Sequence, residues 1–256
     1  MHWNQEATTP LHEERLEAVL DAVRASSARS LLDLGCGDGD LLVRLAQEPR
    51  LEHILGLDLN AKCLAQVRRR LDVAAAFSPQ AESNDANLAQ QGRAHFATSP
   101  SAAQSRSEAV PVPEQRRTRG SNYHQGHRIE LRQGSLTTPD SGLIGFDCAL
   151  LIETIEHINP RDLGQVEQAI FARMCPQTVI ITTPNAEYNP LLEVPPNRFR
   201  HPDHRFEWDR SRFQRWTRGV AQRHGYGLRH RDIGGVDPVY GGASQMALFQ
   251  RQRPER

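Results

Sequence analysis

The chain has 256 residues, and its 31 Lys and Arg balance its 31 Asp and Glu, giving a formal net charge of +0 at pH 7. This balance provides no overall field for nucleic acid or membrane, and no apolar run approaches the roughly 18 residues that a membrane span needs. The four cysteines form no CxxC pair, and the N-terminus lacks the apolar segment of a signal peptide, so we expect a cytoplasmic protein with reduced thiols.

The first part of the chain alternates helices and strands. Apolar spacing predicts an amphipathic helix over 10–25, then the strand Ser30–Leu34 and a glycine turn that leads into a second helix. The strand His53–Asp58 and a helix through Arg70 follow. This alternation predicts a parallel sheet with right-handed crossovers.

Residues 73–127 interrupt the pattern. Ala, Ser, Gln, Asn and Pro dominate this stretch, and large apolar residues are sparse. Such a segment buries too little surface to offset its ordering entropy, so we predict a disordered insertion in a single domain made of 9–72 and 128–251. The basic cluster 116–119 at its end is expected to be solvated, with a phosphate contact as the alternative.

After the insertion, regular structure is predicted to resume. The predicted elements are three strands, two helices, a long loop rich in Pro, Asn and His, and a closing hairpin at the sheet edge. In chain order these elements are the strands Ile129–Ser135 and Phe146–Ile152, the helix Leu163–Met174, the strand Thr178–Thr183, the loop 186–208, a helix capped by Asp209, and the strands Leu228–Ile233 and Gln245–Phe249. Long loops in compact domains are usually functional, so 186–208 is a candidate for site residues.

The glycine turn Asp33–Gly39 is the first candidate site. Glycines let a ligand approach the backbone, and the start of the next helix offers free N–H groups. Asp58, which ends the following strand, lies about 20 residues beyond the glycines, the spacing at which an acid meets a ribose diol. A tight strand-to-helix turn would explain the glycines alone, whereas the strand before them and the acid after them favour a cofactor site.

The whole Asp-x-Gly-x-Gly-x-Gly string, with its later acid, resembles the S-adenosylmethionine site of class I methyltransferases. The resemblance implies an α/β, Rossmann-like fold whose mostly parallel, seven-stranded sheet has helices on both faces. It also implies that six residues bind S-adenosyl-L-methionine, the last two beside the adenine: Asp33, Gly35, Gly37, Asp58, Ser135 and Leu136.

The second candidate site is the segment 153–157, Glu-Thr-Ile-Glu-His, which follows a predicted strand. If it turns into a helix, Glu153, Glu156 and His157 share one face. The carboxyl ends of parallel strands meet at one edge of a sheet, so these side chains should lie near the glycine turn. Two carboxylates and an imidazole there indicate a metal site, although a surface helix start stabilised by its dipole would show the same residues.

Three motifs, 153–157, 182–189 and 200–208, together with the glycine turn, resemble the small-RNA 2′-O-methyltransferases of the Hen family over 10–72 and 128–250. The resemblance implies methyl transfer from S-adenosylmethionine to the 2′-hydroxyl of the 3′-terminal nucleotide of a small RNA. It further implies four residues that act in catalysis as ligands of a divalent metal: Glu153, Glu156, His157 and His204. His201 is the alternative to His204, and an RNA end-repair protein would be a natural partner.

The expected chemistry follows from the ribose hydroxyl, whose pKa lies far above 7. A metal chelated by the free 2′- and 3′-hydroxyls would lower that pKa, and His157 or His204 could take the proton. A mixed oxygen and nitrogen donor set suits Mn²⁺ better than Mg²⁺. In the loop, Arg198, Arg200 and Arg205 could contact the terminal phosphates, or could be solvated charges. Phe206 and Trp208 could stack on the terminal base, or could anchor the loop in the core.

Two other functions fit parts of the pattern. A metal-independent class I methyltransferase for a small molecule or protein would use Glu153 as a simple base. A non-catalytic module that binds RNA ends would need a broken glycine turn or ligand set, and neither is broken in this sequence.

Overall fold

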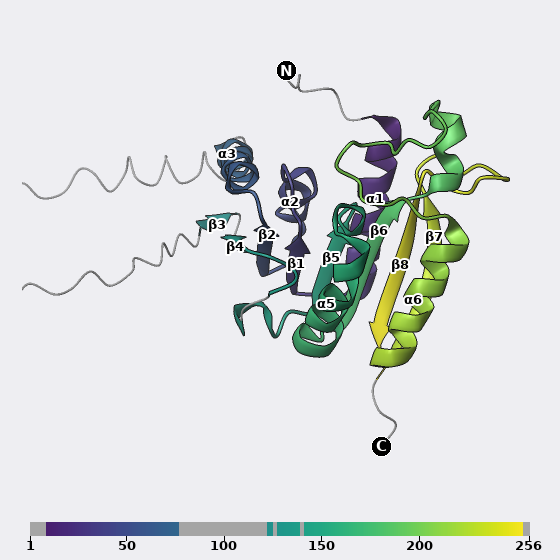
Figure 1. The fold of residues 1–256 in the computed structure, drawn as a ribbon. Helices are drawn as coiled ribbons and strands as arrows, with labels where there is room; N and C mark the ends of the chain where they lie inside the picture. Colours follow the sequence, from purple (N-terminus) through teal and green to yellow (C-terminus); the bar gives the residue numbers. More distant parts are fainter. Residues whose placement is uncertain (1–8, 77–121, 125–126, 139–140, 253–256) are drawn as a thin grey trace, which may run out of the picture.

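The computed structural model describes residues 9–76, 122–124, 127–138 and 141–252, which form an α/β domain built on one sheet (Figure 1). In this part of the chain the sheet has eight strands in the order β3-β4-β2-β1-β5-β6-β8-β7. The strands are β1 (Ser30–Leu34), β2 (His53–Asp58), β3 (Asn122–His124), β4 (His127–Gln133), β5 (Cys148–Ile152), β6 (Thr178–Pro184), β7 (Tyr226–Ile233) and β8 (Ser244–Arg251).

Five neighbouring strands, β4, β2, β1, β5 and β6, run parallel, and β8 pairs antiparallel with both β6 and β7. The mostly parallel, Rossmann-like sheet and the edge hairpin predicted from the sequence are therefore confirmed. The additional strand β3 is short and pairs antiparallel with β4. The predicted insertion 73–127 lies mostly outside the described residues; at its ends, α3 continues to Ala76 and Asn122–His124 forms β3.

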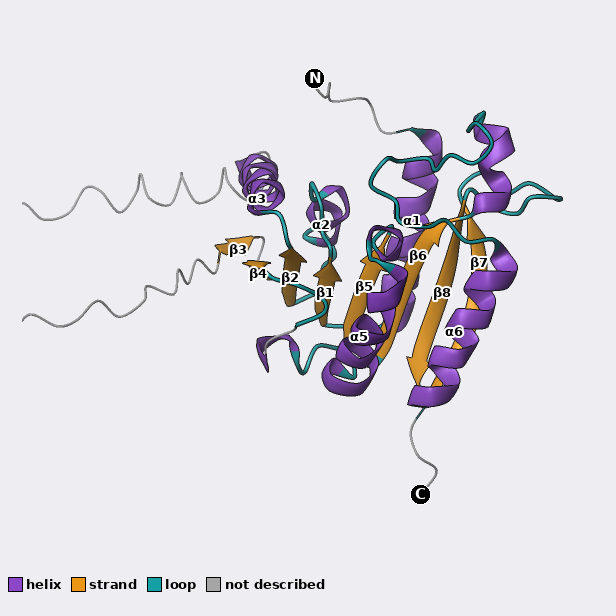
Figure 2. Ribbon diagram, viewed as in Figure 1, coloured by secondary structure: helices purple, strands orange, loops and turns teal. Residues whose placement is uncertain are grey.

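Helices cover both faces of the sheet (Figure 2). They are α1 (Pro10–Ser26), α2 (Asp40–Leu45), α3 (Ala61–Ala76), α5 (Leu163–Glu167) with its π-helical continuation η4 (Gln168–Met174), α6 (Arg210–His224), and the short η1 (Ser141–Leu143), η2 (Ile155–His157), η3 (Pro160–Asp162) and η5 (Ala186–Leu192). Residues of α1, α2 and α3 pack into one apolar cluster, and residues of α5, η4 and α6 pack into another.

Alternation along the strands explains the two clusters. In β1, Leu32 and Leu34 belong to the cluster with α5 and α6, whereas Leu31 belongs to the cluster with α1 and α2. Successive side chains of a strand point to opposite faces, so a strand covered on both sides is mostly apolar, and Asp33 is the buried polar exception in β1. No helix in the described ranges is long and apolar enough to cross a membrane.

Three helix starts carry side-chain caps, among them the predicted cap Asp209. The His12 N–H donates to Thr9 Oγ1 at 3.3 Å, and the Arg212 N–H donates to Asp209 Oδ1 at 2.6 Å. Asn60 accepts from the Lys62 N–H at 3.0 Å just before α3. These side chains satisfy backbone donors that a helix start leaves unpaired.

The fold brings the candidate residues to one edge of the sheet. Because the central strands are parallel, their carboxyl ends lie together, at the upper edge in Figure 2. That edge carries the glycine turn after β1, Asp58 at the end of β2, Glu153 after β5 and Asn185 after β6.

Candidate active site

The glycine turn is held tightly between β2 and β5. Gly35 has a φ of 86° and its N–H donates to the Leu57 carbonyl at 2.7 Å. A Cβ on Gly35 would lie 2.6 Å from Thr154 Cγ2, so the turn packs directly on the segment that follows β5. Gly37, at φ 53°, has open space where its Cβ would be. The first glycine is therefore required by packing, and the second leaves room for a ligand.

Asp58 closes the turn from the neighbouring strand. Its carboxylate accepts from the Gly37 N–H at 2.9 Å and from the Asn60 N–H at 2.8 Å. Its backbone carbonyl accepts from the Gly134 N–H at 3.0 Å, so the predicted adenine-side residues Ser135 and Leu136 follow immediately beside it. Of the residues predicted to bind a cofactor, Asp33, Gly35 and Gly37 share one cavity and Asp58 is hydrogen-bonded to Gly37, whereas Ser135 and Leu136 do not line that cavity.

Asp33 is the buried acid of this group. Only 2% of the residue is exposed, and its Oδ2 has no hydrogen-bond partner among the described residues. Burial, and then the nearby Asp58 charge, raise the pKa of Asp33 to about 7. A cationic ligand group would supply the missing partner.

A cavity of about 180 Å³ lies at the glycine turn and is also lined by Glu153, but not by Glu156, His157 or His204. Its lining includes Gly35, Gly37 and Asp33 of the first candidate site together with Arg15 and Glu153. The first residue of the Glu-Thr-Ile-Glu-His segment therefore faces the same cavity as the glycine turn.

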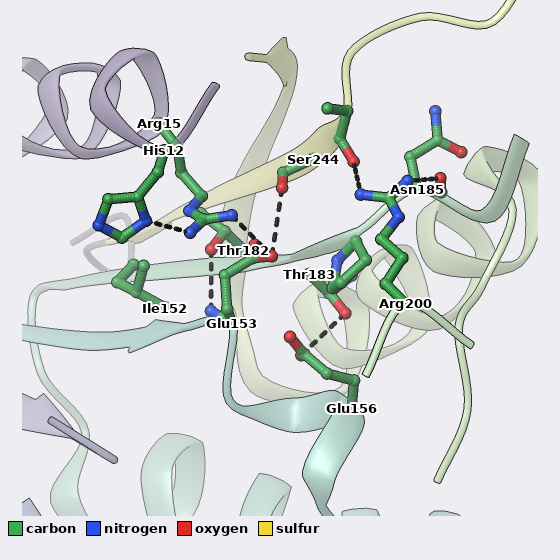
Figure 3. Close-up of polar contacts among 12 residues, drawn as sticks. His12, Arg15, Ile152, Glu153, Glu156, Thr182, Thr183, Asn185, Arg200 and Ser244 are labelled. Carbon is green, nitrogen blue, oxygen red and sulfur yellow. Dashed lines mark hydrogen bonds and ion pairs between the residues drawn. The ribbon is translucent and has the colours of Figure 1, made fainter. Parts of the chain in front are cut away.

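Glu153 is held by partners from three other elements (Figure 3). Its carboxylate accepts from Arg15 Nη1 at 3.1 Å and from Ser244 Oγ at 3.2 Å, and its N–H donates to Thr182. Its φ of 48° lies in the left-handed region. The helix expected to begin at this residue is a single 3-10 turn, Ile155–His157. The prediction that Glu153 shares a helical face with Glu156 and His157 is therefore wrong, because the left-handed residue comes before the turn.

Glu156 is fully buried beside Glu153. Thr183 Oγ1 donates to its Oε2 at 3.0 Å, but its Oε1 has no partner among the described residues, as is also the case for Oε1 of Glu153. Burial and the charge of Glu153 raise the pKa of Glu156. Two adjacent carboxylates with unpartnered buried oxygens are costly unless a cation lies between them.

Three histidines form the cluster of potential metal ligands in the described residues: His157, His201 and His204 have ligand atoms within 4.8 Å of one another, and the glutamates are outside this group. The structure therefore places His201 beside His204, which the sequence ranked first. The pKa of His157 is lowered by burial and by His204 and His201, which keeps its imidazole neutral, the form that binds metals. The Arg205 N–H donates to the Glu156 carbonyl at 2.7 Å. This bond connects the segment 198–208, called here the histidine loop, to the glutamates.

The donor types suit a divalent cation, but the three histidines and the two glutamates lie as two separate groups. Arg15 pairs with Oε2 of Glu153, but Oε1 of Glu153 and Oε1 of Glu156 have no partner among the described residues. The neighbouring imidazoles offer nitrogen ligands of the kind that first-row metals accept. Glu207, with a side chain only 1% exposed, lies 2.6 Å from His204 Nδ1. Burial alone would raise the pKa of Glu207, but hydrogen bonds from His204, Asn189 and Arg200 lower it overall.

Several side chains of the site escaped prediction from the sequence. Arg15 and His12 come from α1, where the spacing indicated only a buried stripe; the two side chains lie 2.6 Å apart. Ser244 comes from β8, nearly a hundred residues from Glu153. No local pattern marks these residues, whereas Glu207 was in a recognised motif and gave no sign of its role.

The loop side chains mainly hold the loop in place. The Arg200 guanidinium donates to the carbonyls of Asn185 and Ala243, which corrects the expectation that it could meet a phosphate (Figure 3). Phe206 and Trp208 are buried and stack on each other with ring centroids 4.3 Å apart, so they anchor the loop and are not free to stack on a base.

Comparison with known proteins agrees with this geometry. Residues 7–233 match the family described as "Methyltransferase domain". The solved methyltransferase domain of bacterial CtHen1-C is 32% identical with a TM-score of 0.68, and the match covers 95% of this chain and 100% of that one. The small RNA methyltransferase HEN1 structure has a TM-score of 0.73 at 27% identity, covering 100% of this chain and 27% of that one.

Among curated proteins, the small RNA 2′-O-methyltransferase of Xenopus tropicalis is 32% identical, and the match covers 96% of this chain and 56% of that protein. The Gallus gallus protein of the same description is 30% identical over 97% of this chain and 56% of its own length. The chain thus spans about half the length of the curated relatives that it matches.

The mostly parallel sheet with an antiparallel β7–β8 edge, the glycine turn after β1 and the acid at the end of β2 fit a class I methyltransferase domain, in agreement with the family match. The chain belongs to the methyltransferase-domain family. Its resemblance to the Hen family, expected from four motifs, is confirmed.

Proposed function

We propose that this chain transfers a methyl group from S-adenosylmethionine to the 2′-hydroxyl of the 3′-terminal nucleotide of a small RNA, and that a divalent metal takes part. One observation carries the proposal: Glu153, a predicted metal ligand, and the glycine turn line the same cavity. The names of the matched proteins supply the substrate class, since those relatives are small RNA 2′-O-methyltransferases.

The residues of the chain have distinct tasks in this proposal. Gly37 leaves the backbone open to the cofactor, Asp58 receives the ribose diol, and Asp33 faces a cationic group of the ligand. S-adenosylmethionine supplies the electrophilic methyl group, and the 2′-oxygen forms a bond to it as the methyl–sulfur bond breaks and S-adenosylhomocysteine leaves.

Glu153, Glu156, His157 and His204 would hold the divalent metal, either Mn²⁺ or Mg²⁺. A cation there would lower the pKa of a ribose hydroxyl, and the mixed donor set favours Mn²⁺. Because the single lone pair of neutral His157 would be on the metal, this ring takes the hydroxyl proton only when it is not a ligand; with all four ligands in place the proton passes to solvent. The orphaned oxygens of Glu153 and Glu156 support this set over a metal-independent enzyme, for which a lone Glu153 base would suffice.

The test is transfer of labelled methyl to RNAs that differ only at the 3′ end. We expect Mn²⁺-dependent transfer to an end with free 2′- and 3′-hydroxyls, loss of transfer with EDTA, and none to a 2′-deoxy or 3′-phosphate end. His204→Ala should reduce transfer by on the order of 100-fold or more, while the matched variant His201→Ala should keep most of it. Transfer that ignores EDTA, or that persists on the 2′-deoxy end, would contradict the proposal.

A further inference from the structure

Glu207 is a buried carboxylate with three hydrogen-bond donors around it. Its Oε1 accepts from the Arg200 N–H at 2.7 Å and lies 2.6 Å from His204 Nδ1, and its Oε2 accepts from Asn189 Nδ2 at 2.8 Å. The side chain is 1% exposed. A carboxylate buried this deeply is stable only with such partners, so its position is fixed by all three.

The contact with Glu207 determines which nitrogen of His204 carries a proton. An ionised carboxylate can only accept, so Nδ1 of His204 must donate. In the neutral imidazole the other nitrogen, Nε2, then presents its lone pair, which is the arrangement that metal-binding histidines share.

His201 is held in the opposite way. Its Nδ1 accepts from the Asp203 backbone N–H at 3.2 Å, so in the neutral ring the proton sits on Nε2. The two loop histidines are close in space, with ring centroids 5.6 Å apart. Of these two, only His204 has its proton held on Nδ1 by a hydrogen bond, which leaves the lone pair of Nε2 available. The hydrogen bonds therefore separate two side chains that the sequence could not.

The loop that carries Glu207 is anchored to the sheet. The Arg200 guanidinium reaches the Asn185 carbonyl after β6 and the Ala243 carbonyl before β8, and its Nε donates to Asn189 Oδ1 at 2.6 Å. Asn189 in turn donates to Glu207. The carboxylate is thus set by the strand ends that also carry the rest of the site.

We propose that Glu207 is a positioning residue that holds His204 with Nε2 directed to the metal. This inference rests on the proposed function, because it assigns a task to a side chain that touches neither substrate nor cofactor. Partners of this kind typically change metal affinity by about 10–100-fold when they are removed.

The experiment measures Mn²⁺ affinity of the full chain by the EPR signal of free Mn²⁺, with S-adenosylhomocysteine affinity measured by calorimetry. Glu207→Gln keeps the shape and removes the charge; we expect about 10–100-fold weaker Mn²⁺ binding and unchanged S-adenosylhomocysteine binding. The matched control is Glu167→Gln, since Glu167 is also buried and accepts from Arg223 and His224 at 2.8 Å between α5 and α6. That variant should bind Mn²⁺ as the unmodified chain does.

A second readout reports the tautomer itself. Nitrogen-15 NMR of the metal-free chain should show His204 protonated on Nδ1 and His201 protonated on Nε2, and Glu207→Gln should weaken the preference at His204 alone. His204 protonated on Nε2 would overturn the inference, and this measurement decides the matter if Glu207→Gln does not fold.

The outcomes separate the inference from the proposed function. Mn²⁺ binding that falls in His204→Ala but not in Glu207→Gln would overturn only the role of Glu207. Mn²⁺ binding that is the same in His204→Ala and the unmodified chain would overturn the proposed ligand set.

Discussion

Asp33 shows how a single residue can oppose folding and still be needed. Its carboxylate is buried without a partner for Oδ2, and its pKa is raised to about 7 by burial and by Asp58. The folded protein therefore holds the Asp33 proton more tightly than the unfolded chain does. Stability from this group is fully present below the unfolded value of 3.8 and is lost as the pH rises through about 7.

Asp33→Asn should remove this pH dependence. Relative to the unmodified chain, the variant should gain about 1.4 kcal/mol of unfolding free energy per pH unit between 3.8 and 7, with no further gain above that range. Urea denaturation at pH 5, 6, 7 and 8 measures the difference. The variant should also bind S-adenosylhomocysteine more weakly, because an amide cannot offer a charge to the ligand.

The matched control for this prediction is Asp38→Asn in the same turn, whose side chain is 53% exposed. It should follow the pH profile of the unmodified chain. A constant gap between Asp33→Asn and the unmodified chain across these pH values would show that Asp33 is ionised in the folded state throughout.

The glycine turn is the element on which the site depends, and its glycines have different tasks. At Gly35 a Cβ would meet Thr154 at 2.6 Å, whereas at Gly37 it would meet nothing within 4 Å. Both residues have positive φ, so a side chain at either position is strained. Only the first substitution also forces the turn away from the segment after β5.

Gly37→Ala should cost about 1 kcal/mol of unfolding free energy from backbone strain. Gly35→Ala should cost that and a further 1–3 kcal/mol, roughly, for the overpacked contact with Thr154. Urea denaturation of both variants gives the comparison. Equal losses would mean that the contact with Thr154 relaxes without cost, and a Gly35→Ala, Thr154→Ser double variant should recover part of the larger loss.

Prediction from the sequence succeeded where the signal is local. The strand before the turn, the acid after it and the loop motif each lie within a short stretch, so their elements and shared edge could be derived from periodicity and strand direction. The prediction for Glu153 was wrong because its backbone adopts a left-handed φ, and the residues that hold it, Thr182, Arg15 and Ser244, lie in distant parts of the chain. The prediction that Arg200 could contact a phosphate was wrong for the same reason. The Asn185 and Ala243 carbonyls that it binds come together only when β6 and β8 are paired.

At the scale of the whole molecule, the net charge of the chain affects how strongly the proposed RNA binding depends on electrostatic attraction. The net charge is +0, so a long-range field contributes little, and in the proposed function RNA would be bound by local contacts at the carboxyl edge of the sheet. Arg198 and Arg205 are exposed on the histidine loop, with Phe199 between them in sequence and 49% exposed. Arg200, by contrast, is occupied by the loop anchor.

The salt dependence of RNA binding should therefore be shallow. Two phosphate contacts on a single strand give a slope of about −1.4 in a plot of log K against log salt concentration. The double variant Arg198→Gln, Arg205→Gln should flatten that slope and weaken binding at low salt, while Mn²⁺ affinity stays the same because neither side chain is a proposed metal ligand. Arg24→Gln is the control and should not change the slope, since Arg24 of α1 pairs with Glu17 of the same helix and with Glu48 after α2. A steep slope that the double variant leaves intact would place the RNA on another face of the molecule, and the carboxyl edge would then accept only the terminal nucleotide.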